Sequence, residues 1–368
     1  MSDVVLLNEH RLEQELVLAE ATLNVPATLN SLSLEMVRML APKLAEWRER
    51  PDVVAVVITG SGDRAFCAGG DIQALYHAIV ANHEAAEIVN DYPFKFFKEE
   101  YELDFALHTF PKPVVTLGNG VVMGGGLGVF SGSSHRVVTE TSRLAVPEIT
   151  IGLFPDAGGT WGLGRMQQHW ASFLGMTGSH VNAADALLTG MATHSVAQAG
   201  KESFVSSLCQ LPFQGDPQAD GNMLNEWLAD QPQAQLPESE MAKLPEWQVD
   251  VADLSSEVAN LQALAGKSKW IDRGLANLAS GCPTTAGIVL EQLRRVPDLT
   301  LADSFRLELT VGTHCANNRD FREGVRALLI DKDNSPNWQY GSIESLDWAH
   351  VLSHFDDPWP EHPLKNLG

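Results

Sequence analysis

Two glycine clusters, each placed after a β-rich run, constrain this chain more than any other feature of its sequence. The first is Phe66-Cys67-Ala68-Gly69-Gly70-Asp71, and the second is Met123-Gly124-Gly125-Gly126-Leu127-Gly128. Each cluster leads into a helical stretch, so each can place bare backbone N–H groups at the start of a helix. Such groups polarise a carbonyl oxygen, and two clusters together favour a two-donor oxyanion hole. Tight packing of a helix against a sheet is the alternative explanation for either cluster alone.

Two acidic residues, Glu148 and Asp156, follow the second cluster, and each comes directly after a proline. The residues between them, 149–154, are mostly apolar. A carboxylate among apolar groups needs a partner or a function, because desolvation raises its pKa. Two other interpretations stay open: Glu148 as an acid of a surface loop, and Asp156 as the N-cap of a helix that begins near Gly158. With the glycine clusters, the two acids indicate nucleophilic or acid–base chemistry on an acyl group.

Composition narrows the classes of partner. The 368 residues suffice for one large or two modest domains, and the hydrophobic content of 44% is typical of a globular chain. A net charge of −22 argues against a nucleic acid or an anionic membrane surface as partner. The histidines and the four cysteines show no metal-site or disulfide spacing, so we expect no metal. The run from Gly118 departs from a dinucleotide fingerprint at Met123, and no phosphate-binding G-x-x-x-x-G-K-[ST] loop occurs, so we expect no cofactor. The acidic residues 1–18 do not resemble a targeting segment, and we expect a reducing, cytoplasmic setting.

The chain changes character along its length. Up to about residue 215, short β-rich runs alternate with helical stretches; Val53–Gly60 and Val114–Gly120 are the clearest strands, and Ser33 is a plausible helix N-cap. Residues 216–250 are rich in Gln, Pro and Asp, which predicts a linker or an exposed excursion. Helical patterns dominate residues 251–368, with segments at 251–265, 268–280, 284–295 and 301–315. We therefore predict an α/β catalytic core over 1–215, a linker over 216–250 and a helical C-terminal region.

These residues resemble a known family. The motifs Ala65–Asp71 and Met123–Gly126 are similar to those of the crotonase, or enoyl-CoA hydratase/isomerase, superfamily. Within it, the chain is most similar to the 3-hydroxyisobutyryl-CoA hydrolases, which carry a motif that matches Pro147 to Asp156. The resemblance implies a crotonase-like β-β-α spiral core with a helical C-terminal region. It also implies hydrolysis of 3-hydroxyisobutyryl-CoA to 3-hydroxyisobutyrate and CoA, a step of valine breakdown.

The resemblance assigns roles to particular residues. It implies that Gly70 and Gly125 provide the oxyanion-hole N–H groups and that Glu148 and Asp156 are the catalytic acids. It further implies substrate contacts by Glu100, Ala68 and Asp71. Without the resemblance, the pair Glu99-Glu100 is more typical of a solvated helix face.

One position separates the hydrolases from the hydratases. Hydratases place a second catalytic glutamate shortly after the three glycines, and this chain has Gly128 there. Addition of water across a double bond is therefore disfavoured. Enoyl-CoA hydratase or isomerase activity, hydrolysis of another short hydroxyacyl-CoA, and non-catalytic CoA binding remain the alternatives.

The expected partner is an acyl-CoA, and its phosphates require positive charge on an acidic protein. The local candidates are Arg64, Lys95, Lys98 and Lys112, although ordinary surface solubility explains most of them equally well. The superfamily often self-associates, so a homo-oligomer is possible.

Overall fold

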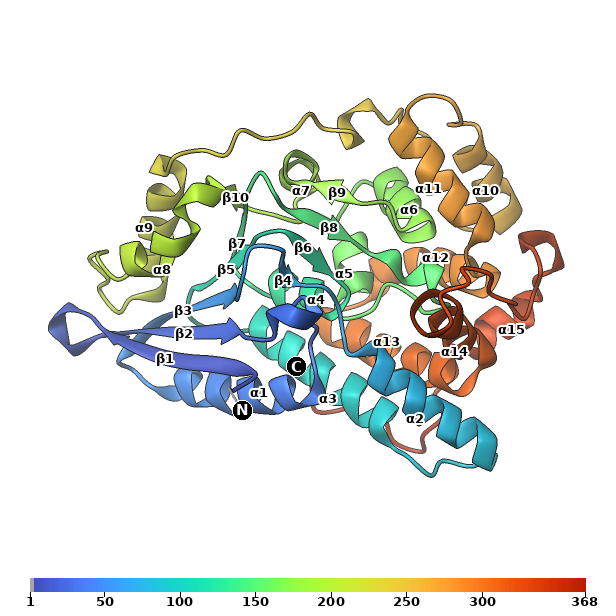
Figure 1. Ribbon diagram of the computed structural model, residues 1–368, viewed down its shortest axis with the longest axis horizontal. Helices are drawn as coiled ribbons and strands as arrows, with labels where there is room; N and C mark the ends of the chain where they lie inside the picture. The colour runs from blue at the N-terminus through green and yellow to red at the C-terminus, as the bar shows by residue number, and fades with distance from the viewer. Residues whose placement is uncertain (1–2) are drawn as a thin grey trace. The chain divides into compact units, whose positions relative to one another are not determined.

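The structure is a computed structural model that describes residues 3–368 (Figure 1). It divides into two compact units that interleave along the chain. The first unit comprises the residues up to Gly70 together with Leu103–Leu144 and Val181–Lys243. The second comprises Asp71–Glu102, Ala145–His180 and Leu244–Gly368. This division differs from the sequential core, linker and C-terminal region expected from the sequence, because the chain passes repeatedly from one unit to the other.

Two sheets organise the first unit. The larger has the order β1-β2-β3-β5-β7-β10; β1 and β2 are antiparallel, and the later neighbours are parallel. Its strands are β1 (Val5–Arg11), β2 (Val17–Leu23), β3 (Val53–Gly60), β5 (Val114–Gly118), β7 (His135–Val138) and β10 (His194–Ser195). The smaller sheet contains β4 (Ala65–Cys67), β6 (Val121–Met123), β8 (Arg143–Ala145) and β9 (Val181–Asn182).

The elements follow one another in a strand–strand–helix repeat. After β3 of the large sheet comes β4 of the small sheet and then α2 (Ile72–Ala85); after β5 come β6 and α4 (Gly125–Ser131). After β7 come β8 and a short 3-10 helix, Pro147–Thr150. This repeat confirms the expected α/β class with β-β-α turns. Each glycine cluster lies at the small-sheet strand of its repeat, where the chain turns into a helix.

Local sequence explains the first long helix. The Ser33 hydroxyl accepts a hydrogen bond from the Met36 N–H (3.2 Å) and caps α1 (Leu34–Glu49), as expected. Pro42 lies inside this helix without ending it. The buried residues of α1, which include Leu40, Leu44 and Trp47, recur at helical spacing.

The segment expected to be a linker differs from that expectation in its first half. Residues Pro217–Asp230 form α9, capped by Asp216, and Leu224 and Leu228 of this helix are fully buried. They pack in one apolar cluster with Val54 and Val57 of β3. The polar composition belongs to the outer face of α9, and the apolar positions four apart form its inner face.

The remaining helices of the first unit are α7 (Ala183–Thr189) and α8 (Lys201–Leu208). Helix α3 (Tyr92–His108) begins in the second unit and ends in the first.

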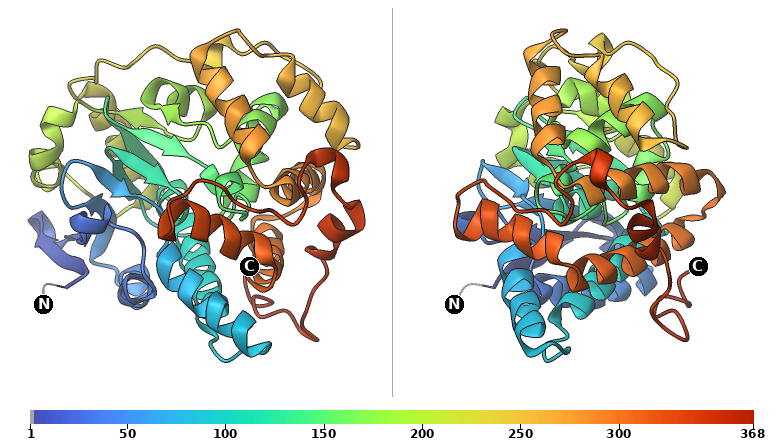
Figure 2. Two further views of the ribbon diagram at one scale, coloured as in Figure 1. Left: turned by 45° about the vertical axis from the view of Figure 1, so that its right-hand side comes forward. Right: turned by 90° about the vertical axis from the view of Figure 1, so that its right-hand side faces the viewer.

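The second unit is mainly helical, and its last third is coloured orange to red in Figure 2. Four helices match the segments expected at 251–315: α10 (Leu254–Gln262), α11 (Lys269–Ser280), α12 (Pro283–Arg295) and α13 (Leu301–Asn317). The others are α2, α5 (Gly159–Leu163), α6 (Gln168–Thr177), α14 (Arg319–Val325) and α15 (Trp348–Ser353). Helices α12 and α13 both contact α5, which follows Asp156 in the chain.

Packing of α9 on the sheet gives a stability prediction. Replacing Leu224 by Ala leaves a cavity against β3 and should lower the free energy of unfolding by about 2–5 kcal/mol. Asn225→Ala, at the exposed neighbouring position, is the control and should change it by less than about 0.5 kcal/mol. Urea unfolding measures both, and equal stabilities for the two variants would contradict the packing described.

Candidate active site

The first unit holds both glycine clusters. Gly69, with a φ of +111°, adopts a backbone conformation that L side chains rarely adopt, and its carbonyl accepts the Leu32 N–H (2.8 Å). Gly70 pairs with Leu32 as an isolated β-bridge and is partly exposed. Ala68 beside it is also partly exposed, and its N–H donates to the Leu29 carbonyl (3.0 Å).

The second cluster lies against the first. A Cβ at Gly69 would come 3.7 Å from the Met123 carbonyl, and a Cβ at Gly126 would come 2.6 Å from the Cβ of Cys67. Only glycine fits at position 126 without a shift, since real Cβ atoms essentially never approach so closely. Gly125 is the first residue of α4, so its N–H has no acceptor within the helix. The structure thus brings the two predicted clusters together, each at the end of a short strand.

In the second unit, Glu148 lies in the 3-10 helix that follows β8. Glu148 is only 4% exposed, and its Oε2 atom has no hydrogen-bond partner among the described residues. Burial, followed by the negative charge of Asp156, raises the pKa of Glu148 well above its usual value. The surface-loop interpretation of Glu148 is therefore wrong. A buried carboxyl oxygen without a partner is costly and uncommon, and it indicates a functional group.

Asp156 is paired with a tyrosine. The Tyr101 hydroxyl donates a hydrogen bond to Asp156 Oδ2 (2.7 Å). Burial raises the pKa of Asp156 to about 6, while the Tyr101 hydrogen bond acts in the opposite direction. The N-cap interpretation of Asp156 is wrong, because α5 is preceded by Gly158 and no side chain caps it as an N-cap residue would. The Asp156 side chain instead faces the α3 residue Tyr101.

A third acid lies nearby, and the sequence did not single it out. Glu308 of α13 is fully buried and accepts the backbone N–H groups of Gly158 and Thr160, both at 2.8 Å. The pKa of Glu308 is raised to about 8, chiefly by burial; the two N–H groups act to lower it, and the charge of Asp156 acts to raise it. The sequence signal for Glu308 is its place on the same face of a helix as apolar residues such as Phe305 and Leu309, which are buried.

The structure also locates the expected substrate contacts. Glu100 is 2% exposed, so the solvated-face interpretation is wrong for this residue. It lies beside Tyr101 on α3, and its charge is one of the causes that raise the Tyr101 pKa, after burial, Asp156 and Glu308. Asp71 accepts the Ala74 N–H (3.1 Å) and caps α2.

The four candidate cations differ in their present partners. Lys95 pairs with Asp91 (2.9 Å) and Lys98 with Glu102 (2.6 Å). The Lys112 amine donates to the carbonyls of Trp47 (2.7 Å) and Arg50 (2.5 Å), so it is engaged in holding the end of α1. Arg64 is exposed and is the candidate that remains most available for a phosphate.

Other classes of site find no support in the described residues. Within 3–368, no group of three or more His, Cys, Asp or Glu side chains could hold a metal ion, and the four cysteines are free thiols. Within the same range, no helix is long and apolar enough to cross a membrane.

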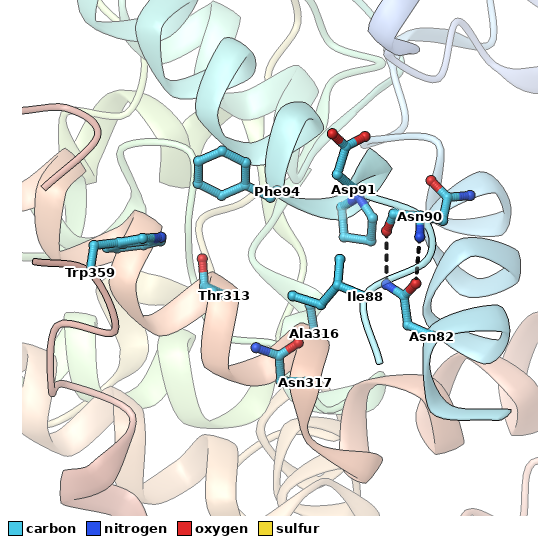
Figure 3. A pocket seen from close by; sticks show the side chains of 10 residues that line it. Asn82, Ile88, Asn90, Asp91, Phe94, Thr313, Ala316, Asn317 and Trp359 are labelled. Atoms are coloured by element: carbon cyan, nitrogen blue, oxygen red, sulfur yellow. Dashed lines mark hydrogen bonds between the residues drawn. The ribbon is translucent and has the colours of Figure 1, made fainter. Parts of the chain in front are cut away.

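A groove in the second unit is lined by residues other than these acids (Figure 3). It has a volume of about 240 Å³ and is lined by the α2–α3 connection, by α13 and by Trp359. Phe94, Ile88 and Trp359 make part of it apolar, while Asn82 bonds the Asn90 carbonyl at one end (2.8 Å). None of the site residues expected from the sequence lines this groove, so the candidate chemistry does not belong to it.

Comparison with known proteins agrees with the geometry. A model of the enoyl-CoA hydratase/isomerase family matches residues 18–355. A Danio rerio protein named 3-hydroxyisobutyryl-CoA hydrolase, mitochondrial, is 35% identical over 335 residues, which cover 90% of this chain and 85% of that protein. The Homo sapiens protein of the same name is 34% identical over 91% of this chain and 85% of its own length.

Solved structures share the fold over nearly the whole chain. An enoyl-CoA hydratase from Rhodobacter sphaeroides has a TM-score of 0.79 and 31% identity, covering 96% of this chain and 97% of its own. A carnitinyl-CoA dehydratase from Mycobacterium thermoresistibile has a TM-score of 0.82 and 30% identity, covering 100% of both chains. The crotonase-like fold expected from the sequence is therefore confirmed.

The Tyr101–Asp156 hydrogen bond gives a titration prediction. Tyr101→Phe removes a donor that favours the ionised carboxylate, so the pKa of Asp156 should rise above about 6. A hydrogen bond to a charged group is worth about 1.5–3 kcal/mol, which corresponds to a rise of roughly one pH unit or more. Infrared titration of protein labelled with ¹³C-aspartate measures the midpoint, and Asp156→Asn identifies the band.

Tyr76→Phe is the matched control, since Tyr76 lies on α2 with its ring against His77. It should leave the Asp156 midpoint unchanged. A midpoint that stayed at its wild-type value in Tyr101→Phe as well would contradict the pairing described.

Proposed function

The chain belongs to the enoyl-CoA hydratase/isomerase family, and we propose that it hydrolyses the thioester of 3-hydroxyisobutyryl-CoA to 3-hydroxyisobutyrate and CoA. Support comes from relatives of that name, which are 33–35% identical to the chain over about nine tenths of its length. The observation that carries the chemistry is the buried Glu148, whose Oε2 has no partner within the described residues and whose pKa is raised by burial and by Asp156.

Hydrolysis forms a bond from a water oxygen to the thioester carbon and breaks the carbon–sulfur bond. The proton released from water ends on the CoA sulfur. In between, negative charge develops on the carbonyl oxygen, and the N–H groups of Gly70 and Gly125 are the donors proposed to stabilise it. Loss of one such donor typically raises the barrier by about 3 kcal/mol.

Both carboxyl groups have raised pKa values. Burial raises the pKa of Asp156 to about 6 against the effect of the Tyr101 hydrogen bond, and burial together with the charge of Asp156 raises the pKa of Glu148 well above its usual value. Neighbouring buried carboxyl groups titrate as a pair, and Glu148 and Asp156 are proposed to share one proton. Passage of this proton to Asp156 leaves Glu148 as a carboxylate, which either attacks the carbonyl carbon or takes a proton from the attacking water.

Hydration of an enoyl-CoA is the runner-up, because the two solved structures cited above are described as a hydratase and a dehydratase. That reaction needs a second acid near the oxyanion donors in the family pattern. At that position the chain has Gly128, buried inside α4 and without a side chain. Non-catalytic CoA binding is less favoured, because a binding module has no need of two neighbouring acids with raised pKa values.

Two further expectations remain proposals. The relatives are named mitochondrial, and the cytoplasmic setting expected from the acidic first residues of this chain stays a prediction. Assembly into a homo-oligomer also stays a prediction.

The role of Glu148 is tested by Glu148→Gln, which keeps the shape of the side chain and removes its basic oxygen. We expect the kcat of thiol release from 3-hydroxyisobutyryl-CoA to fall about 10²- to 10⁴-fold. Binding of CoA, measured by calorimetry, should be retained and controls for folding. Near-normal turnover of Glu148→Gln would remove Glu148 from the mechanism.

A single turnover in H₂¹⁸O separates the two routes left open for Glu148. Attack by the carboxylate forms an anhydride with the acyl group, and its hydrolysis at the Glu148 carbon places ¹⁸O in that side chain. Activation of water places ¹⁸O only in the released acid. Mass spectrometry of the peptide that contains Glu148 reads out the difference.

A further inference from the structure

The segment that carries both acids is held by helix α12 along its length. The Cys282 N–H, just before α12, donates to the Ile149 carbonyl (2.9 Å). One turn into the helix, the Thr285 hydroxyl donates to the Leu153 carbonyl (2.6 Å). Two turns further, Gln292 Nε2 donates to the Pro155 carbonyl (2.9 Å). Three backbone carbonyl groups of this irregular segment thus accept hydrogen bonds from residues of α12 or the residue just before it.

Helix α13 holds the residues that come directly after Asp156. The two oxygens of Glu308 accept separate N–H groups, Oε2 from Gly158 and Oε1 from Thr160. Gln292 also donates to the Thr160 hydroxyl (2.6 Å). The backbone between Asp156 and Thr160 is therefore fixed by two side chains from the C-terminal region.

This backbone needs external support. Ala157 has a φ of +51° and Gly158 a φ of +82°, and a non-glycine residue in the left-handed region is strained. Such a conformation persists only where surrounding contacts over-determine it. The contacts of Glu308 fall on the residues directly after Ala157, and the Tyr101 hydroxyl fixes the Asp156 side chain.

We infer that Glu308 is a positioning residue, which holds the 156–160 backbone so that the Asp156 carboxylate keeps its orientation toward Tyr101, with Gln292 completing the support. The expected effect on catalysis rests on the proposed hydrolysis, whereas the contacts of Glu308 do not depend on it. The role assigned to Glu308 acts through Asp156, because both of its oxygens accept backbone N–H groups of the residues that follow Asp156.

The choice of glutamate at this position follows from geometry. An apolar side chain would leave two buried N–H groups without acceptors, and glutamine offers one acceptor oxygen in place of two. One turn later on α13, a Cβ at Gly312 would come 3.4 Å from the Tyr101 hydroxyl, so glycine there leaves room for the tyrosine. Helix α13 therefore carries Glu308, which holds the backbone after Asp156, and also Gly312, which leaves space for Tyr101.

The test compares two buried glutamates of the second unit. Glu308→Gln removes one acceptor from the 156–160 backbone. Glu257→Gln is the matched control: Glu257 on α10 is equally buried and accepts the Asp250 N–H (3.0 Å) and the Ser172 hydroxyl (2.5 Å), none of them in the 147–160 segment. Hydrogen–deuterium exchange of the peptide covering 154–163 is measured in both, together with kcat and KM for thiol release.

We expect amide exchange of this peptide to become at least about tenfold faster in Glu308→Gln and to stay at the wild-type rate in Glu257→Gln. We further expect kcat of Glu308→Gln to fall about 10- to 100-fold with KM within about twofold, since a small displacement of a catalytic group costs that much. Glu257→Gln should lower only the melting temperature.

A second variant protects the test against misfolding. Gln292→Met keeps the length of the side chain and removes its donor, and it should reproduce the kinetic pattern of Glu308→Gln in weaker form. Unchanged exchange in Glu308→Gln, or faster exchange with unchanged kcat, would overturn the positioning role. A wild-type protein that released no thiol would instead overturn the proposed function, while the exchange rates would still decide whether Glu308 holds the loop.

Discussion

Burial of three carboxyl groups in one compact unit is the constraint on which the rest of this structure depends. Glu148 and Glu308 are buried residues and Asp156 is partly buried, and no lysine or arginine is among the groups that shift their pKa values in the described chain. An ionised carboxylate without compensation costs several kcal/mol to bury. The protein meets this cost with neutral donors: a tyrosine hydroxyl for Asp156 and two backbone N–H groups for Glu308. Glu148 has the least compensation, since its Oε2 has no partner among the described residues, and burial raises its pKa well above the usual value.

Neutral donors require a fixed backbone, and helices of the C-terminal region help to fix it. Helices α12 and α13 hold the 149–160 segment, and α14 packs so closely on it that a Cβ at Gly152 would come 2.5 Å from the Asp320 carbonyl oxygen. The first unit fixes the position of its functional groups differently. There, glycines let two strand ends approach each other, and the functional groups are N–H groups of the backbone itself.

Much of the fold and part of the site could be predicted from the sequence. The strands Val53–Gly60 and Val114–Gly118 are β-branched runs, and the C-terminal helices have regular apolar spacing, so local pattern sufficed. Glu148, Asp156 and the glycine clusters were identified because carboxylates and exposed backbone N–H groups are typical of catalytic sites. The sequence showed helical turns at residues 223–229, but its polar composition predicted a linker rather than the packed helix α9. The buried state of Glu100 depends on tertiary packing that a helix-face pattern does not contain. The pairing of Tyr101 with Asp156 and the contacts of Glu308 join residues 55 and about 150 positions apart, and no local pattern encodes such pairs.

The most direct test of the account is a pair of assays on the same purified wild-type protein. Free thiol release is followed with 3-hydroxyisobutyryl-CoA, and loss of the enoyl absorbance is followed with crotonyl-CoA. The account predicts fast thiol release and a flat enoyl signal, because the buried acids serve hydrolysis and Gly128 provides no second acid for hydration. Loss of the enoyl absorbance without thiol release would contradict it and would identify the chain as a hydratase.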